Sequence, residues 1–179
     1  MGKFSLFILL FLGSVISNKD VYKIHFMTID GEDKSLKEFT GKKIMIVILP
    51  TTQTADDSVF LRSVVKASEN YGNKISVIGM PSFDDGYNAS DSNKLAYYYR
   101  MTMGRTITIS KAMYTRKTSR DKQHSLFSWL THADQNGHFD LEVTGVREKF
   151  FINENGELYG IVSAKGQLNN ELMDRMVNN

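Results

Sequence analysis

One uninterrupted apolar segment constrains the fold of this chain more than any other feature. From Lys43 to Leu49 the sequence reads KIMIVIL, so six consecutive apolar residues follow a single lysine. A strand with apolar residues at successive positions must be covered on both faces, because its side chains point alternately to the two sides of a sheet. The segment therefore predicts a central strand in a sheet that is flanked by helices.

After this strand the spacing of the apolar residues changes. Over Asp56–Tyr71 the apolar residues fall at helical spacing, and Gly72 supplies a stop signal. A second apolar strand follows over Lys74–Met80 and is closed by Pro81. A strand, a helix and a strand joined by such short links form a right-handed crossover, so the sheet is expected to contain parallel strands.

The remaining elements complete an α/β pattern. Thr106–Ile109 is extended without an evident role, and the Asp30-Gly31 pair marks a hairpin-type turn. The other expected elements are a strand over Val21–Ile29, a helical turn at Ser35–Phe39, helices over Asp91–Tyr99, His124–His132 and Leu168–Val177, and a hairpin of the strands Glu148–Ile152 and Leu158–Ser163. This order predicts a thioredoxin-like fold, with a mixed central sheet flanked by helices, an N-terminal extension and an insertion.

The N-terminus carries the features of a secretory signal. After Lys3, the apolar run Phe4–Ile16 is about a dozen residues long, whereas a bilayer span needs about 20. We expect cleavage after Ser17. This would leave residues 18–179 as a single domain, secreted or periplasmic, with no stable membrane span. The alternative is an uncleaved N-terminal membrane anchor.

Composition narrows the chemistry of the chain. The sequence contains no cysteine, which removes disulfides, thiolate catalysis and cysteine-ligated metals. The formal net charge is only +2, and the basic residues are spread along the chain, so nucleic acid is not expected as a partner. A sequon at Asn88–Ser90 is interpreted first as a turn signal. The expected partner is an unknown protein or small molecule.

Four local motifs, in order and at compatible spacing, resemble the glutathione peroxidase family over about residues 22–177. They are Ile29–Gly31 with Ser35–Leu36 and Phe39–Lys42, the strand end Val77–Pro81, the helix Leu126–Leu130, and the hairpin Lys149–Gly156. The resemblance implies a glutathione-peroxidase-like fold. It also implies the activity of the family, which is the reduction of peroxides with electrons from thiols.

The sequence departs from the family pattern at the catalytic positions of the family. The resemblance places the cysteine or selenocysteine of the family at Gln53 and its catalytic glutamine at about Asp84. The Trp-Asn pair of the family is replaced within Gly145–Glu148. A glutamine has no ionisable nucleophile, and peroxide reduction needs a thiolate or selenolate. No residue of this chain is therefore predicted to be catalytic.

Hydroxyl groups near Gln53 are the alternative nucleophiles. They are Thr51, Thr52, Thr54 and Ser58, with Asp56 or Asp57 as the base. A carboxylate is a poor base at neutral pH unless it is strongly desolvated, and a hydroxyl lacks the redox cycle of a thiol. The simpler expectation is that the aspartates cap the following helix and that the threonines satisfy backbone groups at the strand end.

Two polar clusters receive structural interpretations. The first has loop-like spacing that matches no zinc template, so neither a metal nor a cofactor is expected; it consists of His124, His132, His138, Asp134 and Asp140. The second is the basic stretch Arg116–Lys122, which is expected to be a solvated loop. Docking of an acidic or phosphate-bearing partner is the alternative for this stretch.

The leading functional hypothesis is an exported glutathione-peroxidase-like domain that has lost its thiol site and is a non-catalytic binding or interaction protein. One alternative is an oxidoreductase of the oxidative-stress response that works through a non-thiol centre or in a complex. Another is a small-ligand binder at the former active site, with a pocket lined by Thr52, Gln53, Phe83 and Asp84.

Overall fold

The computed structural model describes residues 20–178. The predicted signal peptide and its cleavage site lie outside the described residues, and the division into residues 1–17 and 18–179 stays a prediction. No helix within residues 20–178 combines the length and the apolar character needed to cross a bilayer.

A five-stranded mixed sheet forms the centre of the fold, in the order β5-β4-β3-β6-β7. Its strands are β3 (Lys43–Leu49), β4 (Ile75–Pro81), β5 (Thr108–Ile109), β6 (Lys149–Ile152) and β7 (Leu158–Val162). β3 pairs in parallel with β4 and antiparallel with β6. Every residue of β3 is buried, which confirms the predicted central strand.

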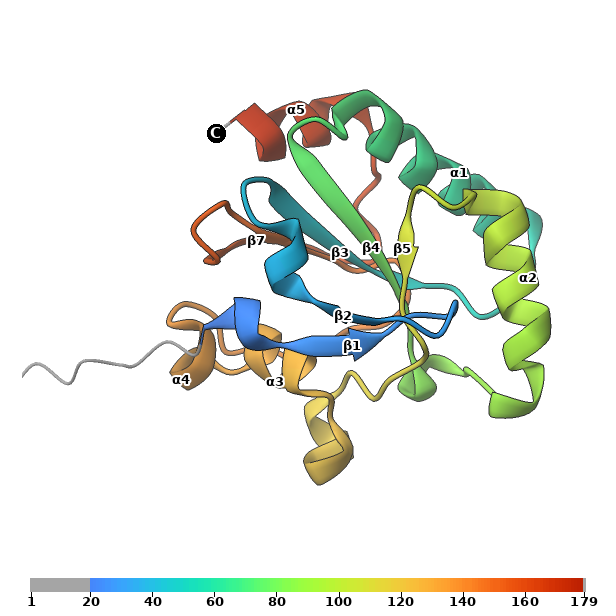
Figure 1. Cartoon of the computed structure of the whole chain (residues 1–179), viewed down its shortest axis with the longest axis horizontal. Helices are drawn as coiled ribbons and strands as arrows, with labels where there is room; N and C mark the ends of the chain where they lie inside the picture. Colours follow the sequence, from blue (N-terminus) through green and yellow to red (C-terminus); the bar gives the residue numbers. More distant parts are fainter. Residues whose placement is uncertain (1–19, 179) are drawn as a thin grey trace, which may run out of the picture.

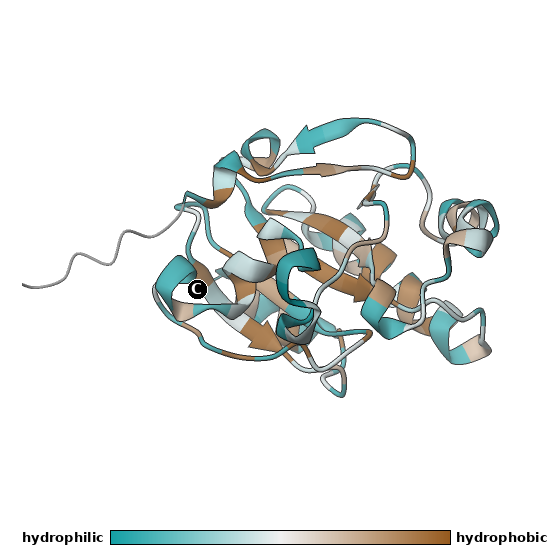
Figure 2. Ribbon diagram, turned by 90° about the horizontal axis from the view of Figure 1, so that it is seen from below, coloured by the Kyte–Doolittle hydropathy of each residue, from teal (hydrophilic) through white to brown (hydrophobic). Residues whose placement is uncertain are grey.

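Helices cover both faces of the sheet (Figure 1). One face carries α1 (Ala55–Tyr71), α2 (Ser92–Met103) and α5 (Asn170–Asn178), and the other carries α3 (Ser125–Thr131), α4 (Ala133–Asn136) and the antiparallel hairpin of β1 (His25–Met27) and β2 (Asp33–Ser35). The alternation along β3 supplies both cores, because Ile46 packs on the α3 side and Val47 on the α1 side. Figure 2 shows apolar residues concentrated on the central strands.

The N-terminal segment differs from its predicted form. The Asp20 side chain accepts a hydrogen bond from the Tyr22 backbone N–H at 3.0 Å and opens a short 3-10 helix over Val21–Lys23. The expected strand over Val21–Ile29 is therefore reduced to the three residues of β1. The predicted turn does form, because Gly31 adopts the positive φ of 86° that the hairpin between β1 and β2 requires.

The core beside β3 gives a stability prediction. Phe150 is fully buried on β6, pairs with Ile46 of β3, and meets Phe127 of α3 edge to face with ring centroids 6.2 Å apart. We expect Phe150→Ala to lower the free energy of unfolding by about 3 to 5 kcal/mol, because it removes buried apolar area and leaves a cavity.

Urea unfolding followed by circular dichroism measures this effect. The matched control is Tyr97→Ala on α2, because Tyr97 is 68% exposed and its loss leaves no cavity. Equal, small effects of the two substitutions would contradict the assignment of Phe150 to the core.

Candidate functional site

Three loops meet at one edge of the sheet, where β3 and β4 end and β6 begins. The segment after β3 contacts the segment after β4, because the Thr51 hydroxyl donates to the backbone carbonyl of Asp85 at 3.0 Å. The loop before β6 joins them through the Arg147 backbone N–H, which donates to the Ile48 carbonyl at 2.7 Å. Because parallel neighbours end at the same edge of a sheet, this is where α/β proteins usually bind ligands.

Asp57 is the centre of the polar contacts at this edge. Thr54 is the N-cap of α1 and accepts from the Asp57 backbone N–H at 3.1 Å, while the hydroxyls of Thr52 and Thr54 both donate to the Asp57 carboxylate. Arg147 donates from Nη2 to the second carboxylate oxygen at 2.9 Å. The carboxylate therefore has a capping role, as expected, and in addition a long-range ion pair.

The environment of Asp57 keeps it ionised. Burial alone would raise the pKa of this side chain, which is only 6% exposed, but hydrogen bonds from Thr52, Arg147 and Thr54 outweigh burial and lower the pKa. A carboxylate that has a lowered pKa and already accepts several hydrogen bonds is a weak base. Asp57 thus has the chemistry of a structural anion.

Arg147 lies within Gly145–Glu148, the segment predicted to replace the Trp-Asn pair, but the sequence analysis assigned this residue no role of its own. Its backbone has a φ of 70°, a left-handed conformation that is uncommon outside glycine. Its guanidinium carbon lies 5.5 Å from the centre of the Phe60 ring, so the side chain is held between a carboxylate and an aromatic face. No local pattern could indicate this contact, because Asp57 and Arg147 are 90 residues apart.

Thr52 and Gln53 lie beside the start of α2. Both line a small cavity of about 250 Å³, together with Thr51, Asp91, Lys94 and Leu95. Gln53 is exposed just before the N-cap of α1, at the position where the family resemblance expects a thiol or selenol. Phe83 and Asp84 do not line this cavity, so the structure brings together two of the four residues predicted for ligand binding.

Asp84 and Phe83 hold the loop that follows β5. The Asp84 carboxylate accepts from the backbone N–H groups of Thr115 and Arg116 at 2.6 and 2.9 Å, and from the Ser119 hydroxyl at 2.5 Å. Burial would raise the pKa of Asp84, but these hydrogen bonds prevail and lower it. Phe83 packs against Tyr114 with ring centroids 5.0 Å apart. The ligand-binding role of both residues stays a prediction.

The segment predicted to replace the Trp-Asn pair contains a glycine that leaves room for an ion pair. Gly145 has a φ of 137°, and a Cβ there would lie 3.4 Å from the Asp85 carboxylate and 3.9 Å from Nη2 of Arg116. Arg116 donates to Asp85 at 2.6 Å. A bulky side chain at position 145 would therefore be strained and would crowd this pair.

Members of both polar clusters take part in structural contacts, and the basic stretch, predicted to be a loop, forms 3-10 turns over Lys117–Lys122. In the basic stretch, Arg116 pairs with Asp85 and Lys117 pairs with Asp140. His124 is the N-cap of α3 and accepts from the Leu126 backbone N–H at 3.2 Å. Within residues 20–178, no three His, Cys, Asp or Glu side chains gather closely enough to hold a metal ion.

Comparison with known proteins identifies the fold. No protein-family model and no curated protein matches the sequence. A solved structure described as Trgpx in apo form has a TM-score of 0.66 at 19% identity, over 90% of this chain and 95% of that chain. A thiol:disulfide interchange protein of the thioredoxin family from Chlorobium tepidum has a TM-score of 0.59 at 17% identity, over 90% of this chain and 94% of that chain. A secreted disulfide oxidoreductase of Mycobacterium tuberculosis has a TM-score of 0.53 at 11% identity, over 88% of this chain and 97% of that chain.

The fold is thioredoxin-like. The solved neighbours include glutathione peroxidase-like and thioredoxin-family proteins, which confirms the fold class and the resemblance predicted from the sequence. At these identities the likeness concerns the fold alone. Within this thioredoxin-like fold, the absence of cysteine fits a lost thiol site.

Lys149 lies under the site as a buried cation. Its ammonium group donates to the backbone carbonyls of Ser163, at 3.4 Å, and Gly166, in the loop between β7 and α5. It also lies 5.6 Å from the centre of the Phe60 ring. Burial lowers the pKa of Lys149 to about 8, and the positive charge of Arg147 contributes to the decrease, against a smaller opposing effect of Glu148.

This pKa predicts a pH-dependent stability. An unfolded chain keeps its lysines near a pKa of about 10.4, so between about pH 8 and pH 10.4 the unfolded state binds more protons at Lys149 than the folded state does. The contribution of Lys149 to the free energy of unfolding must therefore rise with pH in this window. Relative to Lys149→Met, we expect the natural protein to gain up to about 3 kcal/mol between pH 7 and pH 10.5.

Urea unfolding of both proteins across this pH range measures the difference. The control is Lys66→Met, because Lys66 is exposed on α1 and its substitution should give a difference that is nearly independent of pH. A Lys149→Met difference as flat as that of the control would refute the lowered pKa.

Proposed function

We propose that this chain is an exported, non-catalytic binding protein that keeps the scaffold of a glutathione peroxidase without its peroxide chemistry. One observation carries the proposal: the position where the family holds its thiol or selenol is Gln53, and the whole sequence contains no cysteine. A neutral amide neither attacks a peroxide oxygen nor returns to a reduced state with thiols.

The contacts around Gln53 support the loss of catalysis. The Asp57 and Asp84 carboxylates are each occupied by several hydrogen bonds and have lowered pKa values. Neither is available to remove a proton from a nearby threonine or serine hydroxyl. These aspartates stabilise the loops at the sheet edge.

Binding is supported by the cavities at this edge. Thr52 and Gln53 line the cavity of about 250 Å³ beside α2, which contains both an acidic and a basic side chain, Asp91 and Lys94. A concave site with a few polar groups is the usual form of a small-molecule site. This observation favours a small polar ligand as one partner class, with a protein partner as the other.

Export is supported by the sequence and by one neighbour. The apolar run Phe4–Ile16, with cleavage expected after Ser17, has the length of a secretory signal. One structurally similar protein is described as secreted. A secreted or periplasmic location follows for the mature chain in this proposal.

Peroxide consumption tests the loss of chemistry. We expect the purified protein, with hydrogen peroxide or an organic hydroperoxide and with glutathione or a thioredoxin system, to show no turnover above buffer. We expect Gln53→Cys to show no sustained turnover either, because the Asp57 carboxylate nearby opposes thiolate formation and the other family residues are absent.

A second cysteine variant calibrates this test. Glu69→Cys places a thiol on the exposed surface of α1, near its C-terminal end. The two variants should be oxidised by peroxide at rates within about tenfold of each other, since each thiolate reacts without catalytic help. Thiol-dependent turnover by the natural protein would refute the proposal and favour an oxidoreductase with a non-thiol centre.

A further inference from the structure

A groove runs along the side of α1 that faces the loop between β7 and α5. It has a volume of about 770 Å³ and lies between the first half of α1, the loop before β6 and residues 164–168. Its apolar lining comes from Val59, Phe60, Val146 and Leu168, and its cations are Arg147 and Lys165. A mostly apolar cavity of this size with a few convergent polar groups has the form of an organic ligand site.

Arg147 has unused hydrogen-bonding capacity in this groove. A guanidinium carries five N–H donors, and the described residues accept only one bond from it, at Asp57. The side chain lines the groove and is 33% exposed. The ion pair with Asp57 and the contact with Phe60 fix the plane of the guanidinium, so its remaining donors are oriented before any ligand arrives.

The charges around the groove favour an anion. Arg147 and Lys165 line it against one acidic residue, Asp56. The charge of Lys149 lies beneath it, on the Phe60 ring. Asp57 offsets part of this positive charge, but its oxygens already accept bonds from Thr52 and Thr54. The site therefore has cationic donors at one end and apolar walls beside them.

The outer wall of the groove is held in place. Lys149 binds the carbonyls of Ser163 and Gly166 and so fixes the loop that carries Lys165 and Leu168. On the opposite wall, Val59 is 58% exposed, which leaves a large apolar side chain in contact with solvent. A ligand with an apolar body would cover this side chain and gain the free energy of its burial.

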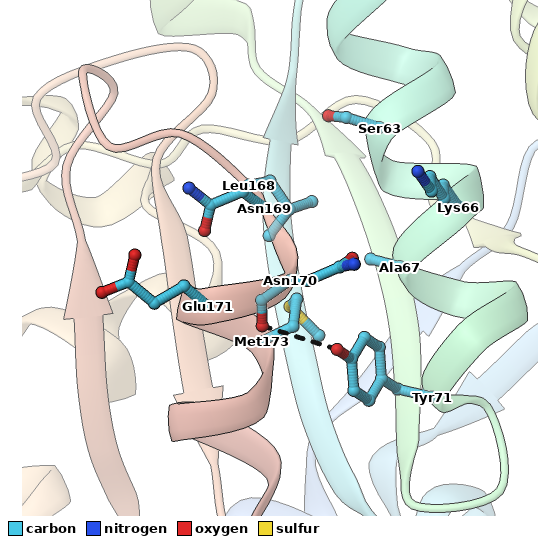
Figure 3. A pocket seen from close by; sticks show the side chains of 9 residues that line it. All are labelled: Ser63, Lys66, Ala67, Tyr71, Leu168, Asn169, Asn170, Glu171 and Met173. Carbon is cyan, nitrogen blue, oxygen red and sulfur yellow. Dashed lines mark hydrogen bonds between the residues drawn. The ribbon is translucent and has the colours of Figure 1, made fainter.

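A second cavity continues the groove toward the end of α1. It has a volume of about 520 Å³ and shares Ser63 and Leu168 with the first. Figure 3 shows side chains of α1, including Lys66 and Tyr71, opposite Leu168, Asn170 and Met173. A ligand with a longer body has room to extend in this direction.

We propose that this groove binds an organic carboxylate with an apolar body, with the carboxylate on Arg147 and the body against Val59, Phe60 and Leu168. The proposal rests on the proposed binding function and adds a second site to it, because the groove shares no lining residue with the cavity of about 250 Å³ beside α2. The carboxylate has two possible sources, a free organic acid or the C-terminus of a peptide with apolar side chains.

Binding of defined probes to the mature protein tests this proposal. The probes are 4-phenylbutyrate and 4-phenylbutanol, which share a body and differ in the carboxylate, and acetyl-Leu-Phe with a free or an amidated C-terminus. Within each pair, titration calorimetry should show that the probe with the free carboxylate binds at least tenfold more tightly than its neutral partner. Backbone amide shifts in two-dimensional NMR should map that binding to residues 59–63 and 164–168.

Two variants test the residues involved. Val59→Glu puts a negative charge at the exposed apolar wall and should weaken binding of the carboxylate at least tenfold, while Met101→Glu, at a 69% exposed position on α2, should leave it unchanged. The double variant Asp57→Asn with Arg147→Asn removes both charges of the ion pair together and should also abolish the preference for the carboxylate. Asparagine tolerates the positive φ at position 147.

The outcomes separate this proposal from the previous one. Tight binding by the free acid alone, or by the free-C-terminus peptide alone, supports the site and identifies the source of the carboxylate. Three results would overturn it. They are no binding of either carboxylate at millimolar concentration, equal binding of the neutral partners, and undiminished binding by Val59→Glu. Each of these results leaves the absence of thiol chemistry, measured by peroxide consumption, standing.

Discussion

The burial of β3 on both faces is the constraint on which the rest of the structure depends. All seven of its residues are buried, and it pairs with a parallel strand on one side and an antiparallel strand on the other. This pairing brings the ends of β3 and β4 and the start of β6 to one edge of the sheet. The contacts of Asp57 with Arg147 and of Thr51 with Asp85 at that edge follow from the topology rather than from nearness in sequence.

The ion pair between Asp57 and Arg147 stabilises this edge of the sheet. Burying one carboxylate is costly unless charges and hydrogen bonds compensate it, and here two hydroxyls and a guanidinium do so. The left-handed backbone at Arg147 has its own cost, of about 1 kcal/mol or more. Such strain persists where the surroundings determine it, and the Ile48 carbonyl, Asp57 and Phe60 all hold this residue.

The sequence predicts what local periodicity encodes. β3, α1 and β4 were expected within about one residue of their observed bounds, because each has a strong apolar pattern and a clear stop signal. The strand at Val21 was predicted too long, because the side chain of Asp20 competes with the extended backbone there. The capping role of Asp57 was predictable from its position in the first turn of α1. Its pairing with Arg147 and the groove along α1 were not, because they join segments that are distant in sequence.

The N-terminus of α1 carries a structural anion in this chain. A helix N-terminus carries partial positive charge and stabilises an anion placed within its first turn. In a thiol enzyme that anion is a thiolate, and the same field makes it reactive. Here the anion is the Asp57 carboxylate, fixed by Thr52 and Thr54, so the field contributes to the stability of the fold. Because Asp57 also pairs with Arg147, the anion in the first turn of α1 is coupled to a guanidinium that lines the groove.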